Sequence, residues 1–314
     1  MAKVYKIGID IGGTNTVVGI IDNNNEILAY DSIKTQEYSL VHKFAEALLE
    51  CIKRLSKPYC VLENLKGVGI GVPNGNFFDG SIANAPNLPW HGVINIKKVF
   101  EDCFKTPVII TNDAKAAALG EMLFGSAKGV KDFIMLTLGT GVGSGFVVGG
   151  RVLYGHNGLA GELGHTTYIP EGRYCSCGKK GCLEAYASAS GVVKTAKELL
   201  AQKPTASILR NKPSLSSKDI AKAASDNDMI AIETLDKTAR ILALKLADCV
   251  ALTAPEKIIL FGGLSGAGNA FINPLRKYFD MFLLDCYKTK VSIELSALKG
   301  NDAAILGAAS LLDL

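Results

Sequence analysis

One histidine and three cysteines within eighteen residues constrain the fold of this chain more than any other feature. His165 closes the run Gly161-Glu162-Leu163-Gly164-His165, and Cys175, Cys177 and Cys182 follow. Zinc is commonly held by four tetrahedral Cys or His ligands. A metal bound by these four would close residues 165–182 into one tight loop, and the glycines beside the thiols suit such a loop.

The same residues allow other interpretations. They could be unrelated core residues or include a disulfide, although Cys175-Ser176-Cys177 is an awkward spacing for an internal one. They could form a purely structural zinc site, or a zinc ribbon that binds nucleic acid or a protein partner. However, Glu162 and Glu184 flank the ligands. A structural site does not need these carboxylates, and they would repel phosphates. We therefore favour a metal site that shapes a polar binding site.

Composition narrows the class of protein. The length of 314 residues suggests two domains. The net charge of +4 is spread thinly, so nucleic acid is not an expected partner. The N-terminus runs straight into a strand-like pattern without a signal peptide, and no long apolar run predicts a membrane span. Since no secretory signal is seen, we expect a cytoplasmic protein with reduced cysteines.

The hydrophobic pattern alternates between strands and helices, which implies an α/β protein. Period-two or short buried runs predict strands at residues 4–11, 17–21, 66–72, 108–110, 133–138, 146–148 and 257–261. Helical spacing predicts helices at 40–55, 114–124, 229–252 and 302–312. Residues 84–92 and 202–218 read as loops.

A strand, a glycine-rich turn and a second strand occur twice. The turns are Asp10-Ile-Gly12-Gly13-Thr14 and Gly139-Thr140-Gly141-Val-Gly143. Glycine lets the backbone approach a phosphate, the threonines can add hydroxyl donors, and Asp10 could bind Mg²⁺ through water. Either turn alone could be a tight hairpin. Gly262-Gly263 follows a third strand and fits an adenine platform or a simple strand-to-helix turn. Neither the P-loop motif nor the dinucleotide motif occurs.

Asn112 and Asp113 lie where a predicted strand ends and a helix begins. Either residue could merely cap the helix. A helix N-terminus would favour the charged form of Asp113, which is the form that a general base needs. Phosphoryl transfer tolerates a weak base, because its catalysis is mostly positioning and electrostatics.

Taken together, these motifs resemble the ROK family of sugar kinases and repressors, within the hexokinase/actin-like ATPase superfamily. The resemblance covers nearly the whole chain, and the block from Gly161 to Glu184 is its most specific part. It implies two actin/hexokinase-like (ribonuclease H-like) α/β domains around a central cleft. The expected lobes are residues 1–113, completed by the helix 302–314, and residues 114–301, which contain the zinc-binding segment 161–184.

The resemblance also implies residue roles. Asp113 would be the base that takes the proton of the sugar 6-hydroxyl. The other hydroxyls would be bound by Asn112, Glu162, His165 and Glu184, with Asn87 as a weaker candidate. ATP and Mg²⁺ would lie against Asp10, Gly12, Gly13, Thr14, Gly139, Thr140, Gly141, Gly262 and Gly263. Zn²⁺ would be held by His165, Cys175, Cys177 and Cys182. With one ring nitrogen on zinc, the other nitrogen of His165 could donate to a sugar oxygen.

Three positions depart from the family pattern. Asn15 replaces a frequent Lys, Asn74 replaces the Gly of a usual Pro-Gly, and Lys115 replaces a frequent Asn. We expect Lys115 to lie beside the site without a chemical role.

The predicted reaction is ATP-dependent phosphorylation of a hexose at its 6-hydroxyl, with glucose as the expected sugar. The alternatives are an N-acetylglucosamine or N-acetylmannosamine kinase, or a kinase for fructose or allose. A sugar-sensing repressor of the family would carry an added helix-turn-helix, for which the ten residues up to Asp10 leave no room. The resemblance further suggests a homodimer or homotetramer.

Overall fold

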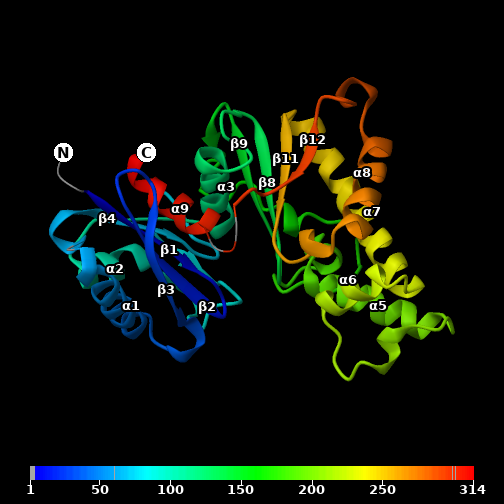
Figure 1. Cartoon of the computed structure of the whole chain (residues 1–314), viewed down its shortest axis with the longest axis horizontal. Coiled ribbons are helices and arrows are strands. Elements are labelled where there is room, and N and C mark those ends of the chain that lie inside the picture. Colours follow the sequence, from blue (N-terminus) through cyan, green and yellow to red (C-terminus); the bar gives the residue numbers. More distant parts are fainter. Residues whose placement is uncertain (1–3, 60, 299, 301) are drawn as a thin grey trace. The chain divides into compact units, whose positions relative to one another are not determined.

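The computed structural model describes residues 4–59, 61–298, 300 and 302–314, which form a mixed α/β protein (Figure 1). The chain divides into two compact units. The described residues of the first unit fall within 1–131, 145–161 and 296–314, and those of the second within 132–144 and 162–295. None of the helices in the described ranges is both long and apolar enough to span a membrane.

The first unit is built on a five-stranded sheet in the order β3-β2-β1-β4-β7. Strand β1 pairs antiparallel with β2 and parallel with β4, and β4 pairs parallel with β7. The strands of the sheet are β1 (Tyr5–Ile11), β2 (Asn15–Ile21), β3 (Ile27–Lys34), β4 (Leu65–Gly71) and β7 (Val108–Thr111). Two short antiparallel pairs join β5 (Ile82–Ala83) to β6 (Val93–Ile94), and the end of β9 (Val142–Val148) to β10 (Arg151–Val152).

Helices α1 (Val41–Ser56) and α2 (Ile96–Phe104) cover one face of this sheet. Their buried Phe44 and Phe100 join a core with Ile7, Ile9 and Ile70 of the strands. Because successive strand residues point to opposite faces, the intervening Gly8 and Gly69 face the other way. There a Cβ on Gly8 would lie 2.1 Å from the carbonyl oxygen of Ile305 in α9 (Asp302–Ser310), which therefore packs directly on the strands.

Helix α3 (Asp113–Phe124) packs against α9 through two glycines, and Figure 1 shows the two helices close together. A Cβ on Gly120 would lie 2.1 Å from the Ala303 oxygen, and one on Gly307 only 1.7 Å from the Ala116 oxygen. Backbone contacts this close leave no room for any side chain. The last helix is thereby locked into the first unit.

The second unit contains the parallel strands β8 (Phe133–Leu138), β11 (Lys257–Phe261) and β12 (Ser292–Leu295). Its helices are α4 (Glu184–Ala187), α5 (Ala189–Gln202), α6 (Ser217–Ser225), α7 (Met229–Thr253) and α8 (Asn269–Phe282). Helix α7 begins at the cap Asp228, whose carboxylate accepts the Ala231 N–H at 3.0 Å, and it ends at Ala254 in the left-handed conformation.

The strands and helices named from the sequence are confirmed to within a few residues. The sequence analysis named no range for strands β3, β5, β6, β10 and β12 or for helices α2, α4, α5, α6 and α8. Residues 202–218 contain a short 3-10 helix (Ile208–Asn211) as well as loop. The compact units differ in extent from the expected lobes, because residues 114–131 and 145–161 pack with the first unit. A lobe boundary after residue 113 stays a prediction.

Candidate active site

In the first unit, the candidate base lies at the carboxyl edge of the parallel strands. Asp10, Gly71 and Thr111 are in register across β1, β4 and β7, and Asn112 and Asp113 follow directly. Asn112 caps α3, since its side-chain oxygen accepts the N–H groups of Ala114 at 3.0 Å and Lys115 at 3.3 Å. The capping alternative for Asn112 is therefore confirmed, while its contact with a sugar stays a prediction.

Burial shifts the pKa of both Asp10 and Asp113 upward. Burial, and then the negative charge of Asp113, raise the pKa of Asp10 from 3.8 to about 7. Burial also raises the pKa of Asp113, although the Ala114 N–H, 2.8 Å from its carboxylate, acts in the opposite direction. The helix N-terminus was expected to favour the charged form. It does so, but burial outweighs it and makes Asp113 a stronger base than a solvated aspartate.

The first glycine turn joins β1 to β2 as a tight hairpin. Close contacts explain its glycines: a Cβ on Gly12 would lie 2.8 Å from the Asn15 oxygen, and one on Gly13 2.8 Å from the Asn87 oxygen. Gln36 also donates to the Asn87 carbonyl at 3.0 Å. The structure thus brings Asn87, a candidate sugar ligand, against the turn expected to bind phosphate, where Thr14 is exposed.

Lys115 is buried and makes contacts that the sequence did not predict. Its side chain is only 1 % exposed, and its Nζ donates to the carbonyl of Gly158 at 2.8 Å. The same Nζ lies 5.6 Å from the ring centroid of Tyr154. Lys115 therefore fastens the first turn of α3, which begins at Asp113, to the segment 155–161.

In the second unit, glycines surround the carboxyl ends of β8 and β11. Gly262 has φ +106°, and a Cβ there would lie 2.6 Å from the Leu138 oxygen, so both conformation and space require glycine. In contrast, a Cβ on Gly139 or Gly263 would meet nothing within 4 Å. The backbone at these two residues is open to a ligand. Gly141 is explained differently, because a Cβ there would lie 2.4 Å from the Glu184 carboxylate.

The four predicted zinc ligands converge. Candidate ligand atoms of His165, Cys175, Cys177 and Cys182 all lie within 4.8 Å of one another. The Sγ atoms of Cys177 and Cys182 are 3.7 Å apart, and Cys175 Sγ is 3.6 Å from His165 Nδ1. Ligands at about 2.3 Å from a tetrahedral zinc would be separated by about 3.8 Å, whereas a disulfide needs about 2.05 Å. The donor set fits zinc, and these cysteines are free thiols.

The segment before His165 packs on the start of β9. The Leu163 N–H donates to the Ser144 hydroxyl at 3.1 Å, and a Cβ on Gly164 would lie 2.1 Å from the Val142 oxygen. Glu162 precedes the 3-10 turn Leu163–His165, and the His165 N–H donates to its carbonyl at 3.1 Å. These backbone contacts position Glu162 and His165 beside the glycine-rich segment 139–143.

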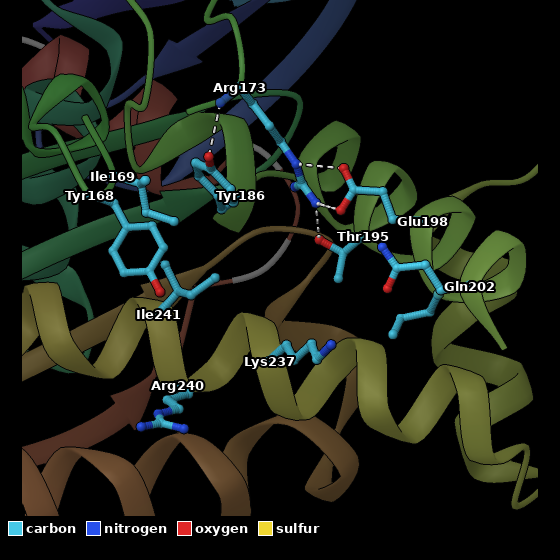
Figure 2. Close-up of a pocket in the computed structure, with 11 residues that line it drawn as sticks. Tyr168, Ile169, Arg173, Tyr186, Thr195, Glu198, Gln202, Lys237, Arg240 and Ile241 are labelled. Atoms are coloured by element: carbon cyan, nitrogen blue, oxygen red, sulfur yellow. Dashed lines mark hydrogen bonds and ion pairs between the residues drawn. The ribbon is translucent and has the colours of Figure 1, made fainter. Parts of the chain in front are cut away.

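Arg173 is a structural residue that the sequence reasoning missed (Figure 2). Its guanidinium donates to both carboxylate oxygens of Glu198, to the Thr195 hydroxyl and to the carbonyls of Ala185 and Gly191. It also lies 4.5 Å from the ring centroid of Tyr186. All five N–H donors are thus used to fasten the chain next to Cys175 to α4 and α5. A lone arginine two residues before Cys175 was the available signal.

A cavity of about 320 Å³ lies beside this clamp (Figure 2). Its walls include Tyr168, Gln202 of α5 and Ile241 of α7, but none of the predicted site residues. The cavity is therefore separate from the residue set that the motifs single out.

Known proteins resemble this chain over almost its full length. The ROK family model matches residues 6–313. A glucokinase of Halalkalibacterium halodurans is 36% identical, and the alignment covers 98% of this chain and 94% of the relative. A glucokinase of Streptomyces coelicolor is 34% identical, and the alignment covers 97% of this chain and 96% of the relative. A ROK family glucokinase from Streptomyces griseus, solved in complex with glucose and AMPPNP, superposes with a TM-score of 0.83 at 32% identity, and 98% of each chain is covered.

Proposed function

Because this chain belongs to the ROK family, we propose that it is a glucokinase that transfers the γ-phosphoryl group of ATP to the 6-hydroxyl of glucose. The observation that carries the proposal is the match to glucokinases at 34–36% identity over nearly the full length of both chains. The relative solved with glucose and AMPPNP shares the fold at a TM-score of 0.83. The actin/hexokinase-like α/β fold expected from the sequence agrees with this neighbour.

Asp113 is the proposed general base. As the sugar oxygen attacks the γ-phosphorus, the hydroxyl proton passes to the Asp113 carboxylate and the bond to the ADP oxygen breaks. The raised pKa of Asp113 supports this role, because a stronger base takes the proton more readily. Asn112 holds the helix start through its cap, so the carboxylate is presented from a fixed backbone.

The nucleotide is proposed to lie against the glycine-rich turns. Gly139 and Gly263, which leave open space, admit close approach of its phosphates and adenosine. The further nucleotide contacts are proposed for Gly12, Gly13, Thr14, Thr140, Gly141 and Gly262. Mg²⁺ would neutralise phosphate charge during transfer. Asp10 in its ionised form would hold that ion through water.

The sugar hydroxyls are proposed to be bound by Asn87, Asn112, Glu162, His165 and Glu184. Zinc, when bound by His165, Cys175, Cys177 and Cys182, would supply a rigid clip for this segment. Since His165 turns Nδ1 toward Cys175 at 3.6 Å, its Nε2–H is the group left for a sugar oxygen. We also propose a cytoplasmic homodimer or homotetramer that binds no nucleic acid.

A substrate panel tests the proposal. ADP release is measured with ATP and Mg²⁺ against glucose, N-acetylglucosamine, N-acetylmannosamine, mannose, fructose and allose. A dominant kcat/KM for glucose is expected. A dominant value for another sugar would reassign the substrate and keep the kinase. Zinc-loaded protein that binds a sugar but turns over none would refute the glucokinase and indicate a sugar sensor or a substrate outside the panel.

A further inference from the structure

One carboxylate in the second unit contacts two segments to which different ligands are proposed to bind. Glu184 is the first residue of α4. Its Oε2 accepts the backbone N–H of Val142, at the glycine-rich turn, at 3.0 Å. Its Oε1 accepts the hydroxyl of Ser176, between two zinc-ligand cysteines, at 3.0 Å. Glu184 therefore bridges the glycine-rich turn and the zinc-binding segment.

The glycine-rich turn is shaped around this carboxylate. A Cβ on Gly141 would lie only 2.4 Å from Glu184 Oε2, so a glycine there leaves the space that the carboxylate occupies. The N–H of Val142 is committed to Glu184, while the Gly139 N–H donates to the Gly141 carbonyl at 3.1 Å. Displacement of Glu184 would leave the turn without one of its holding contacts.

We propose that Ser176 is a positioning residue that acts through Glu184 to couple sugar binding to the conformation of the turn 139–142. The inference rests on the proposed function, in which Glu184 binds a sugar hydroxyl and the turn binds ATP. An ionised carboxylate can accept about four hydrogen bonds. Oε1, which also lies 3.6 Å from Cys175 Sγ, can therefore accept both the Ser176 hydroxyl and a sugar hydroxyl while Oε2 stays on Val142. Whichever ligand binds first orders Glu184 and the turn for the other.

Such coupling is reciprocal: sugar tightens the binding of nucleotide by the factor by which nucleotide tightens the binding of sugar. Ser176 is exposed and is not a predicted metal ligand, so its hydroxyl can be removed without opening a cavity. This makes the contribution of the Ser176–Glu184 bond measurable in folded, zinc-loaded protein.

The test is calorimetric titration with AMPPNP and Mg²⁺, with and without saturating glucose. In the wild type, the dissociation constant of AMPPNP without glucose, divided by that with saturating glucose, should exceed one. Ser176→Ala should lower this ratio by about five- to tenfold, the scale of one ordinary hydrogen bond. It should also raise the KM for glucose by a larger factor than it lowers kcat. Ser176→Thr, which keeps the hydroxyl, should retain the ratio, and so should Ser214→Ala, the change of an exposed serine elsewhere in the unit.

A double-mutant cycle checks that the effect passes through the carboxylate. In a Glu184→Ala background, which removes both carboxylate oxygens, adding Ser176→Ala should not change the ratio further. An unchanged ratio in Ser176→Ala, a ratio of one in the wild type, or loss of zinc from Ser176→Ala would overturn the proposal. The titrations are made only after the wild-type protein has been found to phosphorylate glucose. These outcomes are therefore distinct from failure of the proposed function, which the substrate panel reports.

Discussion

Replacing Asp10 with Asn should make the ligand-free protein more stable at neutral pH and less active. The folded structure raises the pKa of Asp10 from 3.8 to about 7. The folded state therefore binds the proton more tightly than the unfolded state. The resulting stability is fully present below about pH 4 and is lost as the pH rises through about 7. Asparagine does not ionise, so the Asp10→Asn variant avoids this loss.

The magnitude follows from the pKa difference. About 3 pKa units at 1.36 kcal/mol each give the variant a gain in unfolding free energy of at most about 4 kcal/mol at pH 8. At pH 5 the carboxyl group is still protonated in the folded state, so the gain should shrink to about 2 kcal/mol. The ionised carboxylate is also the proposed Mg²⁺ partner, so kcat should fall in the same variant. Stability would thus rise at the expense of activity.

The fluorescence of the single tryptophan provides the assay. Trp90 is buried in the first unit, with its ring 4.8 Å from that of Phe44, so it reports the unfolding of the unit that holds Asp10. Urea unfolding is followed at pH 5 and pH 8 in zinc-loaded protein without Mg²⁺ or nucleotide. Asp102→Asn, on the exposed surface of α2, is the matched control and should change stability by less than about 0.5 kcal/mol. Equal stability of Asp10→Asn and wild type at pH 8, or an equal gain at both pH values, would refute the reasoning.

Three further predictions test the base, the metal site and the packing. Asp113→Asn should lower kcat by about 10²–10⁴-fold with an unchanged circular dichroism spectrum, whereas near-normal turnover would remove Asp113 as the base. Cys177→Ser should lose zinc in metal analysis and raise the KM for glucose, whereas Cys286→Ser, at an exposed thiol, should do neither. Gly307→Ala forces a Cβ to within 1.7 Å of a backbone oxygen of α3 and should cost about 3 kcal/mol in urea unfolding; Gly266→Ala, with nothing within 4 Å, should cost little.

The convergence of His165, Cys175, Cys177 and Cys182 could be predicted because these residues are close in sequence. His165 and Cys182 are joined by one short loop, so composition and glycine spacing suffice to bring them together. Buried strands such as β1 and β8 are likewise visible as apolar runs that end in glycine turns. In contrast, the short helix α2 and the half-exposed strand β3 carry weaker patterns, and the sequence reasoning passed over them.

The chemical state of the candidate base required the tertiary structure. From sequence, the helix N-terminus alone argued for an easily ionised Asp113. The fold buries the Asp113 carboxyl group, and this burial raises its pKa although the helix N-terminus acts in the opposite direction. The contact of Lys115 with Gly158 also required the tertiary structure, because the position of Lys115 in the sequence does not predict it.

The sequence alone therefore indicated the α/β class and the convergence of His165 with the three cysteines, because these depend on local spacing and residue chemistry. The roles proposed for the other site residues came from the resemblance to the family. Only the tertiary structure decided how those residues are held. Three examples are the contact of Glu184 with Gly141 and Val142, the five hydrogen bonds of Arg173, and the close packing of α9 on α3 at Gly307. Each joins segments that are not adjacent in the chain. Such contacts are selected by the packing of the whole unit, and no local pattern encodes them.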